Sequence, residues 1–134
     1  KRPAIMIVGG IGITPFRSII KFLCDTNQKR DIILLFSNKS TLDIVYKDIF
    51  DLASQKLGIK TVYTVTDTTD IPLGWAGRVG YIDAKLIREE VPAYKDRVFY
   101  ISGPHSMVDA FEKTLRGMGL HRNQIKIDFF PGYA

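Results

Sequence analysis

The chain has 134 residues, with 19 Lys and Arg against 14 Asp and Glu, which gives a formal net charge of +5. Its apolar fraction of 46% is enough for one globular domain and excludes a disordered chain. The single cysteine, Cys24, excludes a disulfide scaffold, and together with only two histidines it excludes a zinc cluster. No apolar run is long enough for a membrane span, and the scattered basic residues form no nucleic-acid-binding motif. A lone thiol without a signal peptide favours a cytoplasmic location, and the modest positive charge suits an anionic ligand.

Five short apolar runs predict strands, and the first four are nearly continuous rather than alternating. Such runs are typical of strands that are buried on both faces of a parallel sheet. Between them, apolar residues recur at helical spacing, clearly over 16–23 and 107–115 and more roughly over 44–53 and 84–87. The five strand runs are Ala4–Val8, Ile32–Phe36, Thr61–Thr66, Arg97–Ile101 and Gln124–Phe130.

The strand ends recur at intervals of roughly thirty residues, which is the size of a βαβ unit. This alternation predicts a three-layer α/β domain with a five-stranded parallel sheet, in the order 3-2-1-4-5, and helices on both faces. The longest irregular segment, residues 68–80, is a candidate functional loop. Within it, we expect Trp75 to anchor the loop on the sheet rather than to cover a ligand.

The first candidate site is the glycine turn Val8-Gly9-Gly10-Ile11-Gly12-Ile13-Thr14-Pro15, between a predicted strand and a predicted helix. Glycines at such a turn let the backbone bend tightly and approach a ligand. We expect Thr14 to cap the helix and Pro15 to lie in its first turn, where free amides form a phosphate site. The turn matches neither the G-x-G-x-x-G dinucleotide fingerprint nor the P-loop. Taken alone, it is therefore equally consistent with a tight turn that binds nothing.

A second turn, Tyr100-Ile101-Ser102-Gly103-Pro104-His105-Ser106-Met107, repeats the order of strand, glycine, proline and helix. In a parallel sheet the two turns would place two helix N-termini at the same edge, at the carboxyl ends of the strands. Ligands bind at that edge, where the strand order reverses. The predicted order puts the first and fourth strands side by side, with the crevice between their turns.

The Gly-Gly-x-Gly-x-Thr-Pro turn, the later Gly-Pro-x-x-Met turn and the aromatic C-terminal run together resemble the pyridine-nucleotide domain of the ferredoxin–NADP reductase family. The resemblance covers essentially the whole chain and implies that residues 1–134 form a single NAD(P)-binding domain. It implies that the first turn cradles the pyrophosphate, that the second strand ends at the adenosine ribose, and that the second turn flanks the nicotinamide. The implied cofactor-binding residues are Gly9, Gly10, Gly12, Thr14, Pro15, Ser37, Asn38, Lys39, Thr66, Asp67, Gly103, Pro104 and Met107.

The same resemblance implies that Ser102 and Phe130 are the catalytic positions, near the point of hydride transfer. Many family members carry Cys where this chain has Ser102. A hydroxyl can still form a hydrogen bond, so the substitution bears on the rate and geometry of hydride transfer rather than on binding. Phe130 ends the sequence Asp128-Phe129-Phe130, which is similar to an acidic-x-aromatic ending that lies near the flavin and nicotinamide rings in that family.

The implied function is the nucleotide-binding half of a flavin-dependent NAD(P)H oxidoreductase. The family's FAD or FMN is held by a separate N-terminal β-barrel marked by Arg-x-Tyr/Phe-Ser/Thr, and no arginine in this chain fits that pattern. The nearest match, Arg97-Val98-Phe99-Tyr100, fails at its fourth position. We therefore expect a flavin-binding domain upstream, in the same or another chain, and an electron-transfer partner such as ferredoxin or an oxygenase component. The isolated chain is expected to be inactive.

The end of the second predicted strand bears on the choice between NAD and NADP, because an acid there selects the ribose 2′-hydroxyl and a base tolerates the 2′-phosphate. Ser37-Asn38-Lys39, with no acid before Asp43, slightly favours NADP, although Lys39 as a solvated surface residue is an equal alternative. The competing function is a non-catalytic α/β module that senses a nucleotide or docks a partner. In a module that only docks a partner the glycine turns are purely architectural, whereas a nucleotide-sensing module binds the ligand and signals without electron transfer.

Overall fold

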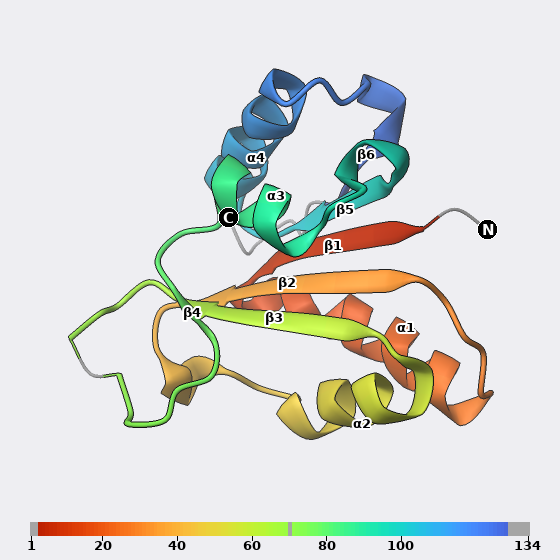
Figure 1. Cartoon of the computed structure of the whole chain (residues 1–134), viewed down its shortest axis with the longest axis vertical. Coiled ribbons are helices and arrows are strands. Elements are labelled where there is room, and N and C mark those ends of the chain that lie inside the picture. The colour runs from red at the N-terminus through yellow and green to blue at the C-terminus, as the bar shows by residue number, and fades with distance from the viewer. Residues whose placement is uncertain (1–2, 70, 129–134) are drawn as a thin grey trace.

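The computed structural model describes residues 3–69 and 71–128, and its centre is one parallel sheet (Figure 1). The sheet has six strands in the order β4-β3-β2-β1-β5-β6. Every neighbouring pair is parallel, so the carboxyl ends of the strands meet at one edge. The strands are β1 (Ala4–Gly9), β2 (Ile32–Asn38), β3 (Lys60–Val65), β4 (Arg78–Val79), β5 (Val98–Ser102) and β6 (Ile125–Asp128).

The expected count of five strands is wrong because the irregular segment contributes β4, a two-residue strand at the edge. β4 pairs with Thr64 and Val65 of β3. The pairing is extended at Gly80, whose carbonyl accepts a hydrogen bond from Thr64 Oγ1 at 2.7 Å and whose amide donates to the Val65 carbonyl at 2.7 Å. The five expected strands keep their predicted relative order, and β4 is added outside β3.

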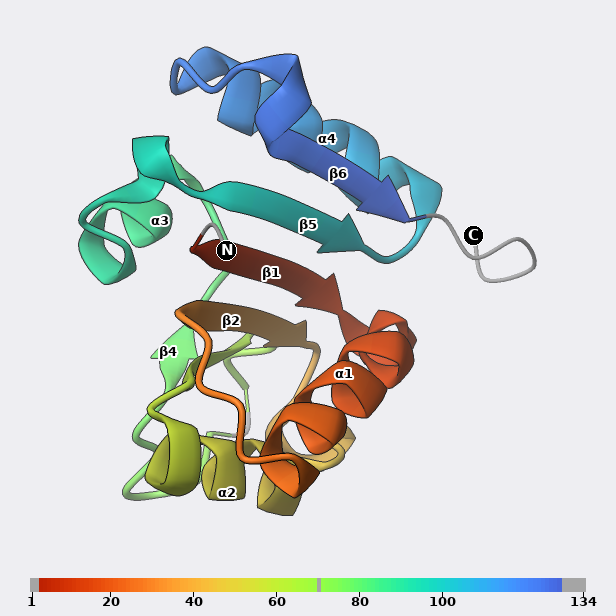
Figure 2. The same cartoon turned by 90° about the vertical axis from the view of Figure 1, so that its right-hand side faces the viewer.

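Among the described residues, four α-helices cover the sheet, two on each face (Figure 2). They are α1 (Thr14–Asp25), α2 (Lys47–Leu57), α3 (Ala84–Glu90) and α4 (His105–Gly117). Four short 3-10 turns, η1 (Gly10–Ile13), η2 (Thr41–Asp43), η3 (Tyr94–Asp96) and η4 (Arg122–Gln124), connect the elements. Within the described ranges, none of the helices has the length and apolar character needed to cross a bilayer.

The two faces of the sheet carry separate cores of different extent. On the α3/α4 face, buried side chains come from β1, β2, β3, β5 and β6, among them Ile7, Phe99 and Ile125. On the α1/α2 face, the buried cluster takes its strand residues from β1 and β2, next to Ile59, and it contains none of the described residues of β5 or β6. Cys24 lies in this second core and is 2% exposed, as expected for a small apolar residue.

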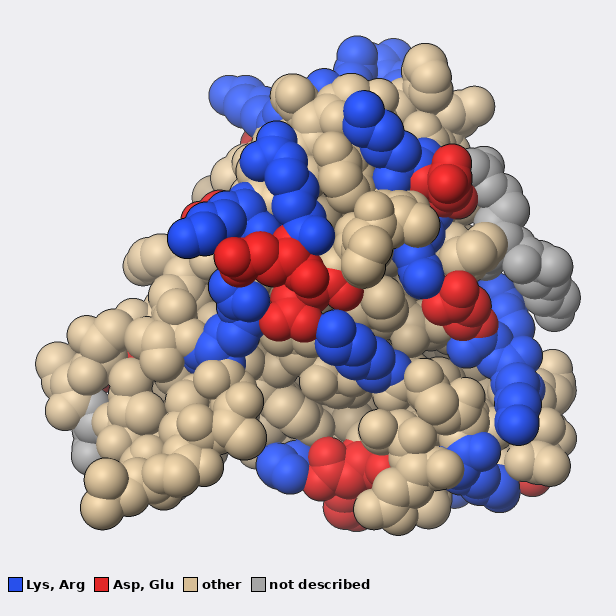
Figure 3. Space-filling view, viewed as in Figure 1, with Lys and Arg blue, Asp and Glu red and all other residues tan. Residues whose placement is uncertain are grey.

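The outer edge of the sheet is tied to α3 by ion pairs that form the mixed red and blue patch in Figure 3. Arg78 contacts Glu89 at 2.6 Å and Glu90 at 3.0 Å, and Lys60 contacts Glu90 at 2.7 Å. The hydrogen bond from Lys60, together with Arg78, lowers the pKa of Glu90. Trp75 packs beside this edge and donates from Nε1 to the Arg78 carbonyl at 3.2 Å, a hydrogen bond that ties the loop to β4.

Candidate functional site

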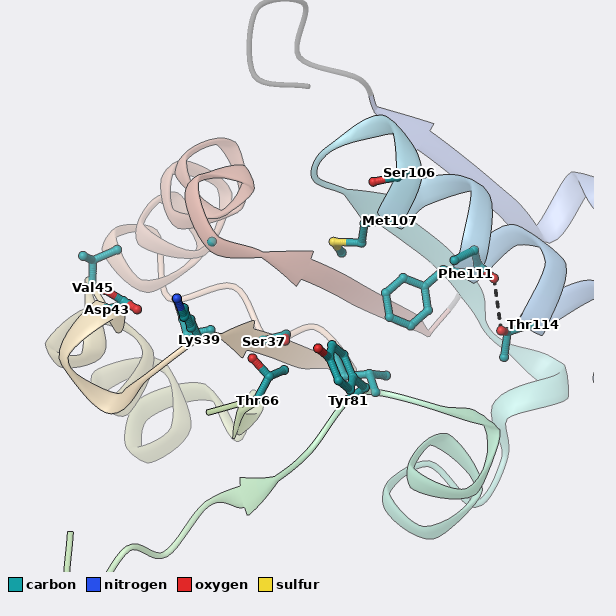
Figure 4. A pocket seen from close by; sticks show the side chains of 14 residues that line it. Ser37, Lys39, Asp43, Val45, Thr66, Tyr81, Ser106, Met107, Phe111 and Thr114 are labelled. Atoms are coloured by element: carbon teal, nitrogen blue, oxygen red, sulfur yellow. Dashed lines mark hydrogen bonds between the residues drawn. The ribbon is translucent and has the colours of Figure 1, made fainter. Parts of the chain in front are cut away.

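Both glycine turns lie at the carboxyl edge of the sheet, and a cavity of about 800 Å³ opens between them and the ends of β2 and β3 (Figure 4). Met107 and Phe111 project into it from α4, opposite Ser37 and Thr66 at the strand ends. Six of the predicted binding residues line this cavity together: Gly10, Ser37, Asn38, Lys39, Thr66 and Met107.

The three glycines of the first turn leave room for different neighbours. Gly10 has a φ of +52°, which disfavours other residues, and it alone of the three lines the cavity. A Cβ on Gly9 would lie 2.5 Å from Met107 Sδ. A Cβ on Gly12 would lie 2.8 Å from the carbonyl oxygen of Ser102. Only Gly10 is therefore placed to face a ligand, while the other two admit neighbouring parts of the protein.

The second turn is packed against the first. A Cβ on Gly103 would lie 2.6 Å from Met107 Sδ, so Met107 fills the space beside both Gly9 and Gly103. Ser102 is 0% exposed, and its hydroxyl donates to the Gly12 carbonyl at 3.1 Å. The catalytic role of Ser102 stays a prediction, and the observed contact is a bridge between the two turns.

The start of α1 differs from the prediction. Thr14 is already the first helical residue, and Ile13 occupies the cap position without a side-chain hydrogen bond to the helix. The prediction that Thr14 caps the helix is therefore wrong. Its cause is η1, which begins at Gly10 and runs directly into α1, so no extended residue precedes the helix. Pro15 lies in the first turn, as expected.

The remaining predicted residues that the structure describes are not part of the cavity lining: Gly9, Gly12, Thr14, Pro15, Asp67, Ser102, Gly103 and Pro104. Asp67 closes a local turn, since its Oδ1 accepts hydrogen bonds from the Thr69 amide at 3.0 Å and the Thr69 hydroxyl at 2.6 Å. These hydrogen bonds lower the pKa of Asp67. Phe130 lies outside the described residues.

The polar end of the cavity is formed where β2 ends. Asn38 is 5% exposed, and its side-chain Nδ2 is buried without a hydrogen-bond partner among the described residues. A buried donor without an acceptor is costly, so we expect an oxygen of a ligand or of water to accept a hydrogen bond from this amide. Lys39 and Asp43 both line this end, and Asp43 accepts hydrogen bonds from the Ser40 amide at 3.1 Å and hydroxyl at 3.2 Å.

The other end of the cavity is an apolar and aromatic wall that sequence reasoning missed. Tyr81, which follows Gly80, is 78% exposed at the rim. Phe111 belongs to the apolar stripe over 107–115, and the structure places it both against the core and in the cavity wall. The sequence signal that could have identified Phe111 is its helical spacing from the other apolar residues of the same stripe. The missed lining residues are Asp43, Val45, Tyr81, Ile82, Ser106, Ala110, Phe111 and Thr114.

The arrangement suits an elongated ligand that has a planar end, a polar end and an anionic middle. Aromatic side chains at Tyr81 and Phe111 offer faces for a ring, and the amide of Asn38 offers a donor. Gly10 brings backbone close to the cavity just before the N-terminus of α1, which favours an anion. Among the described residues no group of three or more His, Cys, Asp or Glu side chains could hold a metal ion.

His105 is an exposed first-turn residue of α4. Its side chain is 63% exposed, and its Nδ1 lies 3.2 Å from a carboxylate oxygen of Asp109 one turn later. It is absent from the cavity lining, so the geometry gives it no part in the site.

Known proteins share this fold and this sequence pattern. The family model described as "Oxidoreductase NAD-binding domain" matches residues 6–113. NADH-cytochrome b5 reductase 1 of Mortierella alpina is 36% identical over 116 residues, which are 85% of this chain and 38% of that protein.

Two solved structures show the same architecture. The ferredoxin reductase in carbazole 1,9a-dioxygenase is 30% identical with a TM-score of 0.74, over 96% of this chain and 37% of that one. The flavohem-like FAD/NAD-binding domain of nitric oxide dioxygenase from Vibrio cholerae is 21% identical with a TM-score of 0.80, over 97% of this chain and 52% of that one. The chain spans little more than a third of the b5 reductase. With these matches, this chain belongs to the oxidoreductase NAD-binding domain family of ferredoxin reductase-like proteins.

Proposed function

We propose that this chain is the nicotinamide-nucleotide-binding part of a flavin-dependent NAD(P)H reductase. The observation that carries the proposal is the cavity at the switch point of the sheet, which joins the Gly10 turn to the unpartnered amide of Asn38. The family match and the reductase relatives support it. A bound nicotinamide supplies or accepts a hydride, and the work of this chain is to hold and orient it.

Each part of the nucleotide has a place in this proposal. The pyrophosphate lies at Gly10 and the start of α1, where backbone amides and the helix dipole favour negative charge. The adenosine ribose lies at the end of β2, where Asn38 supplies a donor. The nicotinamide lies toward Met107, between the two glycine turns. Met107 and Phe111 exclude water from that side of the cavity.

The choice between NADP and NAD turns on Lys39 and Asp43. The preference for NADP from the sequence rested on Lys39 with no acid before Asp43, yet Asp43 lines the same cavity as Lys39. A carboxylate there accepts a hydrogen bond from a 2′-hydroxyl and repels a 2′-phosphate. We therefore favour NADH over NADPH, with Asp43 as the discriminating residue. The NADH-cytochrome b5 reductase among its relatives is consistent with this choice.

The binding test is a calorimetric titration of this chain with NADH and with NADPH. We expect NADH to bind at least about tenfold more tightly, a difference of about 1.4 kcal/mol. Asp43→Asn should reduce that ratio by relieving the repulsion of the 2′-phosphate. Asp51→Asn, an exposed substitution on α2, is the matched control and should leave the ratio unchanged. Absence of binding for both nucleotides at millimolar concentration would contradict the proposed function.

The rest of the reductase is also a proposal. The flavin, FAD or FMN, is held by a separate domain, and electrons pass on to a partner such as ferredoxin or an oxygenase component. The ferredoxin reductase of carbazole 1,9a-dioxygenase is a relative that works in such a system. A cytoplasmic location stays a prediction.

A further inference from the structure

A second cavity, of about 510 Å³, lies on the outer side of β3. Its wall comes mainly from the start of α2, from the first half of β3 and from the loop that leads to β4 (Figure 1). Among the described residues, this cavity and the nucleotide cavity have no lining residue in common. Its volume is within the range of pockets that hold small molecules.

The cavity lies where β4 is too short to cover β3. β4 pairs only with Thr64 and Val65, so no strand among the described residues pairs with residues 60–63 on that side. The loop before β4 crosses the open edge at Gly77, where a Cβ would lie 2.7 Å from the carbonyl oxygen of Tyr63. The first half of β3 therefore has a pocket where a longer neighbouring strand would lie.

Trp75 forms a fixed aromatic wall of this cavity. Its ring lies against Gly77, since a Cβ there would lie 2.7 Å from Trp75 Cε2, and its Nε1 donates to the Arg78 carbonyl at 3.2 Å. The glycine and the hydrogen bond together hold the indole in one orientation. A ring that is already fixed loses little freedom when a planar ligand packs against it.

β3 adds a hydroxyl and a second aromatic ring to the lining. Thr61 Oγ1 is buried and has no hydrogen-bond partner among the described residues. Tyr63 lies on the same face of the strand, because side chains alternate, and it packs against the α1/α2 core. Burial, together with the carboxylate of Asp51, raises the pKa of Tyr63, so its hydroxyl stays neutral. We expect the Thr61 hydroxyl to donate to an oxygen of a ligand, because a buried hydroxyl without a partner is costly.

The lining carries more positive than negative charge. Lys60 and Arg78 are held in ion pairs with the glutamates of α3. Lys47 is the cation that can turn toward a ligand, because its side chain is 56% exposed and its ion pair with Asp51 is at the surface. Its Nζ lies 5.7 Å from the centre of the Tyr63 ring, on the face that carries Thr61. An exposed ion pair contributes little, so exchanging Asp51 for a ligand carboxylate costs little. The charged residues of the lining, among those described, are Lys47, Lys60, Arg78 and Glu90.

We propose that this cavity, which we call the β3-edge pocket, binds a small aromatic carboxylate. The ring of the ligand packs against Trp75, and its carboxylate accepts hydrogen bonds from the Thr61 hydroxyl and the Lys47 ammonium. The fixed indole favours a planar ring, the buried hydroxyl favours an oxygen, and the excess of cations favours an anion. The proposal goes beyond the nucleotide site and does not depend on it.

Benzoate is the probe, and Trp75, the only tryptophan of the chain, is the reporter. We expect benzoate to change the fluorescence of Trp75 in a saturable way, with a dissociation constant of about 10 mM or tighter. Benzamide, which is neutral, and cyclohexanecarboxylate, which is not planar, should each bind at least about fivefold more weakly. Absence of saturable benzoate binding, or equal binding of the three probes, would overturn the proposal.

Two variants and one matched control locate the probe. Thr61→Val removes the hydroxyl with little change of shape, Lys47→Gln removes the cation, and each should weaken benzoate binding at least about fivefold. Lys21→Gln is the control, because Lys21 forms the same kind of exposed ion pair on α1, with Asp25 at 2.8 Å, and it should leave the constant unchanged. Thr61→Val should be as stable as wild type, because its hydroxyl has no partner to lose. Wild-type affinity for benzoate in both pocket variants would also overturn the proposal.

A competition experiment separates the two cavities. Saturating ADP should leave the dissociation constant of benzoate unchanged, because the cavities share no lining among the described residues. Competition by ADP would place benzoate in the nucleotide cavity and would count against the β3-edge pocket. Failure of the chain to bind ADP and NADH would contradict the proposed function instead, and the benzoate titrations of the variants would still decide this proposal.

Discussion

The two strand-to-helix turns share glycine and proline, yet they use their glycines differently. The first turn contains Gly10, which lies open at the cavity with a positive φ. In the second turn, Met107 occupies the space that a side chain on Gly103 would need. In the first turn, Met107 also occupies the side-chain space of Gly9, and the backbone of Ser102 occupies that of Gly12. A glycine motif at a ligand site can therefore be required as much by protein packing as by the ligand.

The largest effect is expected at Gly12. Its missing Cβ would lie 2.8 Å from a backbone oxygen of Ser102, and the strands that carry both turns pair directly, so neither can move away. Gly12→Val should lower the free energy of unfolding by about 3 kcal/mol in chemical denaturation. Gly117→Ala, at the end of α4 with no atom within 4 Å of the new Cβ, is the control and should not destabilise. A Gly12→Val protein of wild-type stability would show that the two turns are not packed as described.

Gly10 should respond to backbone conformation instead of crowding. No atom lies within 4 Å of a Cβ built there, but its φ of +52° is strained for an L residue. Gly10→Ala should therefore lower the free energy of unfolding by about 1–2 kcal/mol. Gly10→Asn should lose less, because Asn tolerates the left-handed region better. Equal losses in the two variants, measured by urea denaturation, would mean that conformation is not the reason for this glycine.

Ser102 tests the bridge between the turns. Ser102→Ala removes the hydrogen bond to the Gly12 carbonyl and should lower the free energy of unfolding by about 1 kcal/mol. Ser102→Cys keeps a weak donor and should restore part of that loss. If Ser102→Ala changes the rate of flavin reduction in the full reductase without changing stability, the predicted catalytic role gains over the bridging role.

The smallest effect is expected at Gly9. The atom that its Cβ would meet is Met107 Sδ, on a flexible side chain that can turn aside. Gly9→Ala should lower the free energy of unfolding by less than about 1 kcal/mol, and Met107→Ala in the same chain should cancel that loss. A double-mutant cycle measures the coupling. Additive effects of the two substitutions would show that Met107 does not fill this position.

Much of the fold was predictable because buried parallel strands leave continuous apolar runs. The runs beginning at Ala4 and Ile32 match β1 and β2 closely. β4 could not be predicted, because two residues carry no periodicity and Arg78 joins the sheet only through its neighbours on β3. The cap at Thr14 was misplaced for a related reason, since a 3-10 turn before a helix has no distinct sequence pattern.

The polar half of the site was predictable and the aromatic half was not. Ser37 and Asn38 end β2 and Lys39 follows it directly, and the ends of parallel strands meet at one edge of the sheet. Tyr81 and Phe111 reach the same cavity from a loop and from the flank of a helix. The position of Phe111 depends on how α4 packs across the sheet, and that of Tyr81 on the path of the chain between β4 and α3; sequence spacing specifies neither.

The place of β1 in the sheet has a consequence for how the chain folds. β1 is first in sequence but central in space, since Ala4 pairs with Ile32 on one side and with Val98 on the other. During synthesis, α1 and α2 can cover one face of β1 before β5 and α4 have been made. Until then one edge of β1 is unpaired and its other face is uncovered. Ile5 and Ile7 point to the face that is still uncovered at that stage. Late, long-range pairing of this kind slows folding and leaves apolar strands open to aggregation until most of the chain has been made.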